Sequence, residues 1–226
     1  MKIAVLSANL GAYDRHVDWV DQVVTGATVD IHRFTDHNFP GREKAMLSAL
    51  KCGLPKMFGW QLRPGYDIYI WIDASRGLLR SDTAQWFIDA LGQSDLLLFL
   101  HPERSTVKAE YAFVKAKLDA DSRYLSQRYA GEWIDEQYIA ATPPGYVDDR
   151  LYASTAFAYR PATNVTRMLS AWWAHKSRYC LHDQFALPHL VREHRIDVVE
   201  RSESVYAFEH LPITRVKRKR LRRRAA

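Results

Sequence analysis

The feature that most constrains the fold is a largely apolar run at 66–72, YDIYIWI, which directly follows Pro64 and Gly65 and is polar only at Asp67. Its last five residues, Ile68 to Ile72, are all β-branched or aromatic. A continuous apolar run of this length, bounded by a turn, is typical of a strand buried on both faces. Strands of this kind belong to sheets covered by helices on both sides. The run therefore predicts an α/β protein.

Two polar residues, Asp73 and Ser75, end this strand. Strand side chains alternate between faces, so these two point the same way. Ligands of open α/β sheets bind outside the carboxyl ends of the strands, where both residues are expected. Their oxygens suit a hard divalent cation held against a phosphate. A carboxylate that caps the next turn is an equal alternative from these residues alone.

The composition indicates one large domain without a membrane span. The chain has 226 residues, 47% of them hydrophobic, which is enough for a full core. It contains no apolar stretch of about 18 residues, and its first residues become polar too soon for a signal peptide. Cys52 and Cys180 are too few and too far apart for a disulfide framework or a metal knuckle. We therefore expect a cytoplasmic protein.

The net charge of +6 comes from the last residues of the chain. Eight Lys and Arg residues lie between Arg215 and Arg224, and without them 24 basic residues stand against 26 acidic ones, a net charge of −2. We expect a domain at 1–211 and a basic, disordered tail at 212–226. Such a tail suits binding to nucleic acid or to an anionic membrane surface. It would place the protein on nucleic acid or at the periphery of the inner membrane. A solubilising terminus is the alternative.

Hydrophobic patterning predicts alternating strands and helices. Strands are expected at 1–9, 28–34, 66–72, 95–100, 151–159 and 196–199, and helices at 14–25, 42–52, 83–91, 106–120, 121–141, 164–175 and 183–194. No repeat or linker divides the chain. This alternation predicts a single Rossmann-like α/β domain with a mainly parallel central sheet flanked by helices.

Several common catalytic motifs are absent from the sequence. No Gly-x-Gly-x-x-Gly follows the first strand, and no Gly-Lys-Ser/Thr phosphate loop occurs. The chain also has no nucleophile elbow and no His-Glu-x-x-His helix. These absences argue against dinucleotide enzymes, P-loop NTPases, α/β-hydrolases and zinc proteases.

Polar residues gather instead at the predicted ends of strands. They are Ser7, Asn9, Tyr13, Asp36, Asp73, Ser75, His101 and Arg104, with Ser154 and Thr155 inside a strand and His182, Asp183 and Gln184 opening a late helix. In a parallel sheet several of these would meet at one edge. Three basic residues, Arg42, Lys51 and Lys56, lie between the second and third strands and could neutralise a diphosphate. A cap, a satisfied core group or a solvated helix face is the alternative for each residue.

Five blocks of the sequence carry a family resemblance. They are AVLSANLGAY at 4–13, 51–73 with LPKMFGWQLRPGYDIYIWID, HPERSTVKAE at 101–110, 155–160, and 172–184 from WW to HDQ. The chain resembles the glycosyltransferase-like domain of the plant turgor-regulation and mucilage-pectin proteins and their bacterial relatives. The blocks span nearly the whole chain except the basic tail. The resemblance implies a glycosyltransferase A-type fold, a UDP- or GDP-sugar donor and a divalent metal, Mn²⁺ or Mg²⁺.

The resemblance also implies roles for residues. An Asp-x-Asp element would carry metal and diphosphate, but here it reads Asp73-Ala74-Ser75 and lacks the second carboxylate. The implied metal ligands are Asp73, Ser75 and His182, unless Lys and Arg replace the metal. The donor side would comprise Ser7, Asn9, Tyr13, Asp36, Arg42, Lys51, Lys56, Asp73 and Ser75, and the acceptor side Ser154 and Thr155. Asp183 and Gln184 resemble the late Asp-Gln pair of glycogenin-like enzymes and would form the catalytic side with His101 and Arg104.

The implied reaction moves a hexose to the hydroxyl of a glycan, a lipid-linked glycan or a modified DNA or RNA base. Its transition state resembles an oxocarbenium ion, which a nearby carboxylate or amide oxygen stabilises. An inverting enzyme would also need a general base. Asp183 is the candidate for the reaction centre, as base, stabiliser or sugar-hydroxyl ligand. The alternatives are a non-catalytic nucleotide-sugar or nucleic-acid binding module, which the incomplete Asp-x-Asp element supports, and a hydrolase using the same site.

Overall fold

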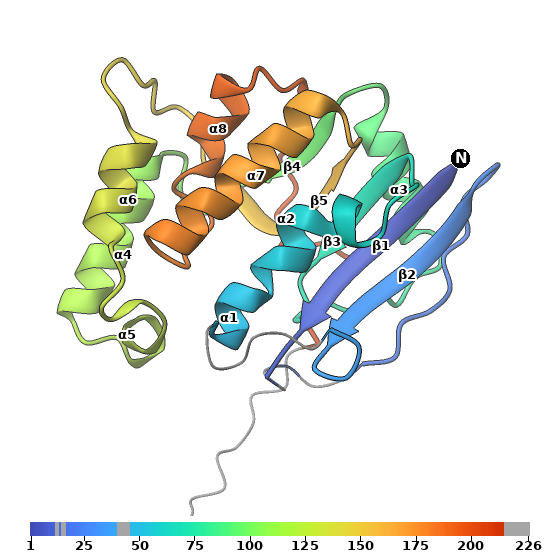
Figure 1. The fold of residues 1–226 in the computed structure, drawn as a ribbon, viewed down its shortest axis with the longest axis horizontal. Helices are drawn as coiled ribbons and strands as arrows, with labels where there is room; N and C mark the ends of the chain where they lie inside the picture. Colours follow the sequence, from blue (N-terminus) through green and yellow to red (C-terminus); the bar gives the residue numbers. More distant parts are fainter. Residues whose placement is uncertain (12–13, 15–16, 40–45, 215–226) are drawn as a thin grey trace, which may run out of the picture.

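A computed structural model describes residues 1–11, 14, 17–39 and 46–214. Its centre is a six-stranded sheet with the strand order β2-β1-β3-β5-β4-β6 (Figure 1). The strands are β1 (Lys2–Asn9), β2 (Thr28–Thr35), β3 (Ile68–Ile72), β4 (Leu96–Leu100), β5 (Tyr152–Tyr159) and β6 (Val198–Arg201). All six predicted strands are therefore present, and the α/β class is confirmed.

The sheet is mixed, and the prediction of a mainly parallel sheet was wrong. β1 pairs in parallel with β2 and β3, and β4 pairs in parallel with β6. β5 lies between β3 and β4 and is antiparallel to both. Sequence patterning does not reveal strand direction, because a central strand is apolar whichever way it runs.

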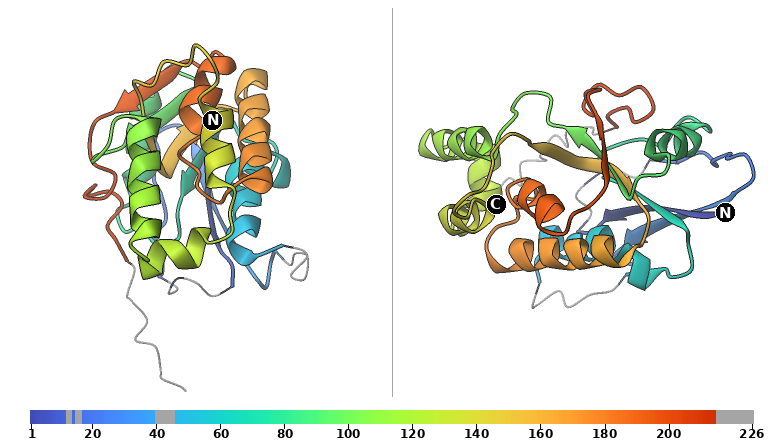
Figure 2. Two further views of the ribbon diagram at one scale, coloured as in Figure 1. Left: turned by 90° about the vertical axis from the view of Figure 1, so that its left-hand side faces the viewer. Right: turned by 90° about the horizontal axis from the view of Figure 1, so that it is seen from above.

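Helices cover both faces of the sheet. They are α1 (Ser48–Lys51), α2 (Gly53–Leu62), α3 (Thr83–Leu91), α4 (Val107–Asp119), α5 (Arg123–Tyr129), α6 (Ile134–Ala141), α7 (Thr163–Arg178) and α8 (Leu187–Glu193). Figures 1 and 2 show α2, α7 and α8 on one face and α3 on the other, while α4, α5 and α6 stand to one side. No helix of the described residues is long and apolar enough to cross a membrane.

The core consists of two layers, one on each face of the sheet. Alternate residues of β3 serve both layers: Tyr69 and Trp71 pack toward α2 and α7, and Ile70 packs toward α3. All five β3 residues are buried, as the apolar run predicts. Burial of β3 on both faces fixes its carboxyl end, and therefore Asp73, in one place.

Three helix predictions need correction. Val17–Ala27 form no helix, and their backbone instead bonds to Leu78 and Ser81. Within the described part of 42–52 only α1 is helical. The longer α2 was not predicted, because it contains Gly53, Pro55 and Gly59, residue types that usually interrupt helices. The late helix begins at Leu187 and not at residue 183. Residues 183–186 form a non-helical turn before it.

Candidate functional site

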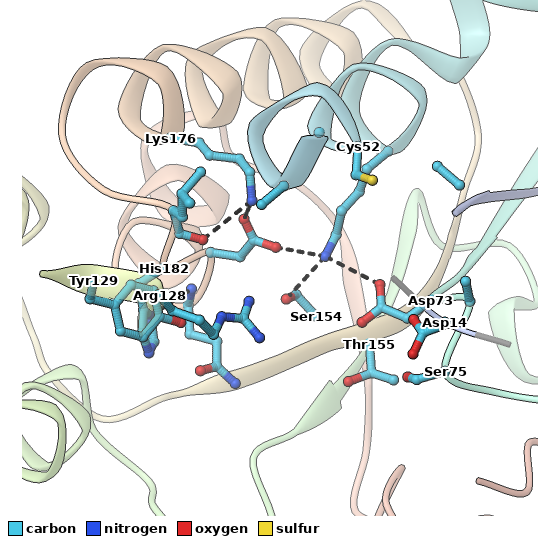
Figure 3. Close-up of a pocket in the computed structure, with 18 of the residues that line it drawn as sticks. Asp14, Cys52, Asp73, Ser75, Arg128, Tyr129, Ser154, Thr155, Lys176 and His182 are labelled. Carbon is cyan, nitrogen blue, oxygen red and sulfur yellow. Dashed lines mark hydrogen bonds and ion pairs between the residues drawn. The ribbon is translucent and has the colours of Figure 1, made fainter. Parts of the chain in front are cut away.

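A cleft of about 590 Å³ opens at the carboxyl ends of β1, β3 and β4. Its lining includes most of the predicted site residues: Asn9, Lys56, Asp73, Ser75, His101, Arg104, Ser154, Thr155, His182, Asp183 and Gln184 (Figure 3). Residues from all parts of the domain therefore meet at one edge of the sheet, as the polar strand ends predict.

The reversed direction of β5 brings Ser154 and Thr155 to this edge. The Asp73 amide donates to the carbonyl of Thr155 at 2.9 Å, so the start of β5 lies beside the end of β3. Pairing with β4 shifts at this point, from Leu98 with Phe157 to Phe99 with Ala153. Such irregularities re-aim side chains next to sites. In a parallel sheet these two residues would lie at the opposite edge.

Asp183 is held between two lysines at the centre of the cleft. Lys56 Nζ lies 2.8 Å from Oδ2, and Lys176 Nζ lies 2.5 Å from Oδ1. Its side chain is 15% exposed. Burial alone would raise the pKa of Asp183, but Lys176 and Lys56 outweigh it and hold the pKa well below its usual range. Asp183 is therefore ionised at neutral pH.

Lys56 connects the two carboxylates of the cleft. Lys56 lies on α2. This helix packs so closely on β1 that a Cβ at Gly59 would overlap the side chain of Leu6. Besides Asp183, its Nζ contacts Ser154 Oγ at 3.3 Å and Asp73 Oδ1 at 3.8 Å. Burial lowers the pKa of Lys56, but the two aspartates more than compensate and raise it. The ammonium group is thus charged and fully engaged.

Asp73 ends β3 and faces the cleft with one oxygen already bound. The indole of Trp71 donates to Oδ1 at 2.8 Å. The backbone then turns, with the Arg76 amide donating to the Asp73 carbonyl at 2.9 Å. The Asp73 side chain is 38% exposed, so a ligand in the cleft can reach it.

A second polar cluster joins α4 to the 181–184 loop. Glu110 accepts hydrogen bonds from His182 Nε2 at 2.9 Å and from the guanidinium of Arg104. Burial raises the pKa of Glu110, but the hydrogen bonds and charges of His182 and Arg104 lower it overall. The ring of His182 also stacks on Phe185, with centroids 4.2 Å apart. This cluster fixes Arg104 and His182 in place.

His101, which follows β4, is hydrogen-bonded within its own turn. Its Nδ1 accepts from the backbone amides of Glu103 and Arg104, at 3.2 and 3.1 Å. Burial, partly opposed by Glu110, lowers the pKa of His101. Its Nε2 lies 3.3 Å from Nη2 of Arg104, so both ring nitrogens face N–H donors. These contacts fix the His101 ring beside Arg104 in the cleft.

Five predicted donor-side residues do not line the cleft or lie outside the described part of the chain. Ser7 is buried within β1. The Asp36 carboxylate accepts a hydrogen bond from the amide of Gly11 at 2.8 Å and lies 3.8 Å from Lys51 Nζ. Asp36 and Lys51 therefore contact the cleft only indirectly, through Gly11, which lines it. Tyr13 and Arg42 lie outside the described residues.

The three residues predicted to hold a metal are not gathered. In Figure 3, Asp73 and Ser75 lie on one side of Ser154 and His182 lies on the other. His182 Nε2 is engaged with Glu110. No group of three or more His, Cys, Asp or Glu in the described ranges could hold a metal ion. Asp73 and Ser75 both line the cleft, and Lys56 Nζ lies 3.8 Å from Asp73 Oδ1.

Sequence reasoning missed five charged cleft residues, Asp14, Arg76, Glu110, Arg128 and Lys176. Two of them had a detectable signal. Lys176 continues the apolar stripe of α7 through Leu169 and Trp172, so helical spacing places it on the buried face. Glu110 lies three residues after the buried Val107 in the same way. For Arg76 and Arg128 no such pattern exists.

Comparison with known proteins gives no further guide to this cleft. No protein-family model matches the chain, and no curated protein matches it. The chemistry of the cleft and the motif resemblance are therefore the basis for assigning a function.

Proposed function

We propose that the chain is a glycosyltransferase with a glycosyltransferase A-like fold, which moves a sugar from a UDP- or GDP-sugar to an acceptor hydroxyl. The observation that carries the proposal is Asp183, an ionised carboxylate between Lys56 and Lys176, in the same cleft as Asp73. This arrangement pairs a carboxylate for the reacting sugar with a strand-end acid for the donor.

The dimensions and chemistry of the cleft support a nucleotide-sugar. Its volume of about 590 Å³ falls within the range of roughly 300–1,000 Å³ that is usual for small-molecule sites. Carboxylates suit sugar hydroxyls, and the cations Lys56, Arg76 and Arg128 suit phosphates. Aromatic side chains, Trp71 and Tyr206 among them, add surface for a ring.

Among the roles open to Asp183, stabilisation of the transition state fits best. A general base at neutral pH needs a pKa near 7, whereas the lysines hold the pKa of Asp183 well below its usual range. Both of its oxygens are also engaged. An ionised carboxylate of this kind stabilises positive charge at the anomeric carbon or fixes a sugar hydroxyl. Lys56 and Lys176 are then positioning residues.

The acceptor is proposed to be anionic, a lipid-linked glycan or nucleic acid, because of the basic residues from Arg215 to Arg224. The amide of Thr214, the residue before this basic run, donates to the carbonyl of cleft-lining Ser75 at 3.0 Å. Truncation after Thr214 keeps this bond and removes the charges. Loss of binding to anionic vesicles favours the first acceptor, and loss of a salt-sensitive DNA shift favours the second.

The proposal is tested by incubating the protein with UDP- and GDP-sugars, with and without Mn²⁺, and measuring thermal shift and nucleoside diphosphate release. A donor at 100 times its Kd should add about 2.7 kcal/mol of stability. Asp73→Asn, which keeps an acceptor for Trp71, should abolish release, while Asp89→Asn on the exposed side of α3 should not. Donor binding without turnover would identify a binding module, and turnover without an acceptor a hydrolase.

A further inference from the structure

Arg76 is a buried cation that lines the cleft beside Asp73. Only 5% of the Arg76 surface is exposed to solvent. Nε has no hydrogen-bond partner among the described residues, and Nη1 makes only long contacts, 3.3 Å to the Tyr206 carbonyl and 3.4 Å to the Leu211 carbonyl. Buried polar groups without partners are rare, and each one calls for an explanation.

Three other cations of the cleft differ from Arg76 because each pairs with a carboxylate. Lys56 and Lys176 both bind Asp183, and Arg104 binds Glu110. Arg76 forms no ion pair with a carboxylate of the described part of the chain, although the charge of Asp73 reaches it. A buried guanidinium that keeps its charge without a carboxylate is suited to an anion supplied by a ligand.

The C-terminal strap, defined as residues 204–214, holds Arg76 in this position. The ring of Tyr206 lies under the guanidinium, with its centroid 5.7 Å from Cζ. The backbone of Arg76 forms an isolated antiparallel β-bridge with Ile213, and the amide of Gly77 donates to the Pro212 carbonyl at 2.9 Å. The backbone on both sides of Arg76 is thus fixed, so the fork is preorganised before any ligand enters.

We propose that Arg76 binds the phosphate oxygens of the donor's diphosphate, and that this guanidinium supplies the cation which a complete Asp-x-Asp element would recruit as a metal. The inference rests on the proposed function and names the residue that neutralises its leaving group. The C–O bond between the anomeric carbon and the phosphate breaks, its electron pair passes to the nucleoside diphosphate, and the acceptor oxygen bonds to the carbon and loses its proton to solvent or a base. Arg76 stabilises the charge that develops on the diphosphate.

The incomplete motif agrees with this assignment. Ser75 stands where a second carboxylate is usual, and the next residue is Arg76. With Lys56 3.8 Å from Asp73, the single carboxylate already has a cation nearby. Beside Asp73, the protein cations Lys56 and Arg76 favour binding of a diphosphate without requiring a divalent ion.

The test measures binding of inorganic pyrophosphate and UDP by calorimetry, in EDTA and in Mn²⁺. We expect wild-type protein to bind both in EDTA. Arg76→Gln should weaken both by about tenfold to a hundredfold, the effect of losing a charge-assisted hydrogen bond. Arg76→Lys, which keeps the charge but not the fork, should bind more tightly than Arg76→Gln. Arg80→Gln is the matched control, because Arg80 lies on the same segment, outside the cleft, and pairs with Asp82.

Binding by the wild-type protein that is detectable only with Mn²⁺ would overturn the inference, and this result needs no variant to fold. Unchanged pyrophosphate affinity in folded Arg76→Gln would overturn it as well. If pyrophosphate binding depends on Arg76 but no nucleotide-sugar is turned over, the anion site stands and the proposed function fails. If sugar transfer occurs but requires Mn²⁺, the proposed function stands and this inference fails.

Discussion

The two charge clusters of the cleft, one around Asp183 and one around Glu110, share one arrangement but differ in their exposure to solvent. In each, one carboxylate is held by two cationic or ring donors: Asp183 by Lys56 and Lys176, and Glu110 by Arg104 and His182. The Asp183 side chain is 15% exposed, whereas that of Glu110 is 4% exposed. Both carboxylates line the cleft, but Asp183 is the more accessible of the two. Access, rather than the number of partners, therefore distinguishes these two carboxylates.

The largest expected effect is that of Asp183→Asn. The change leaves Lys56 and Lys176 buried with an amide in place of a charge, so stability should fall by about 3–5 kcal/mol. Sugar transfer should also be lost, because no anion remains near the anomeric carbon. Urea unfolding gives the first quantity and nucleotide release the second. A stable, active variant would remove the distinction drawn between the two clusters.

The pH dependence of stability should follow Asp183. Because its pKa is depressed in the folded protein, the stabilisation is fully present above the unfolded pKa of about 3.9 and is lost as pH falls toward the folded value. Urea midpoints between pH 2 and pH 5 measure this loss. Asp183→Asn should flatten the curve over that window. An unchanged slope in the variant would assign the acid sensitivity to other carboxylates, with Glu110 the next to test.

Glu110→Gln should have a smaller effect on stability and affect catalysis only indirectly. The amide still accepts from one partner, so we expect a loss of about 1–3 kcal/mol. Since Glu110 positions Arg104 and His182, KM should rise more than kcat falls. Steady-state kinetics separate the two constants. A loss of kcat equal to that of Asp73→Asn would mean that Glu110 itself reaches the substrate.

The smallest expected effect is that of Ser154→Ala. It removes one acceptor of Lys56, at 3.3 Å, while both aspartates remain, so stability should change by about 1 kcal/mol or less. Thermal unfolding measures the change. Lys115→Ala, which breaks an exposed pair with Asp135, serves as the comparison and should shift stability even less. A much larger loss for Ser154→Ala would show that the hydroxyl, and not Asp183, fixes Lys56.

Sequence patterning was sufficient for the six strands and for several helices, but not for every helix or every polar contact. The apolar run at 68–72 predicts β3, and the polar residue that ends the run, Asp73, marks the end of the strand. Helical spacing predicts α3 and α4 nearly to the residue. It fails for α2, since glycine and proline there serve close packing on β1 instead of ending a helix.

What the sequence determined by itself is therefore the α/β class, the strand ends and the polar residues that follow them, since these depend on local hydrophobic periodicity. Only the tertiary structure decided that β5 runs antiparallel and brings Ser154 to the cleft. It also decided that two lysines from separate helices share Asp183, and that Arg76 is buried by a strap some 130 residues further along the chain. These contacts join residues far apart in sequence, and their energies depend on burial and distance, which no local pattern encodes.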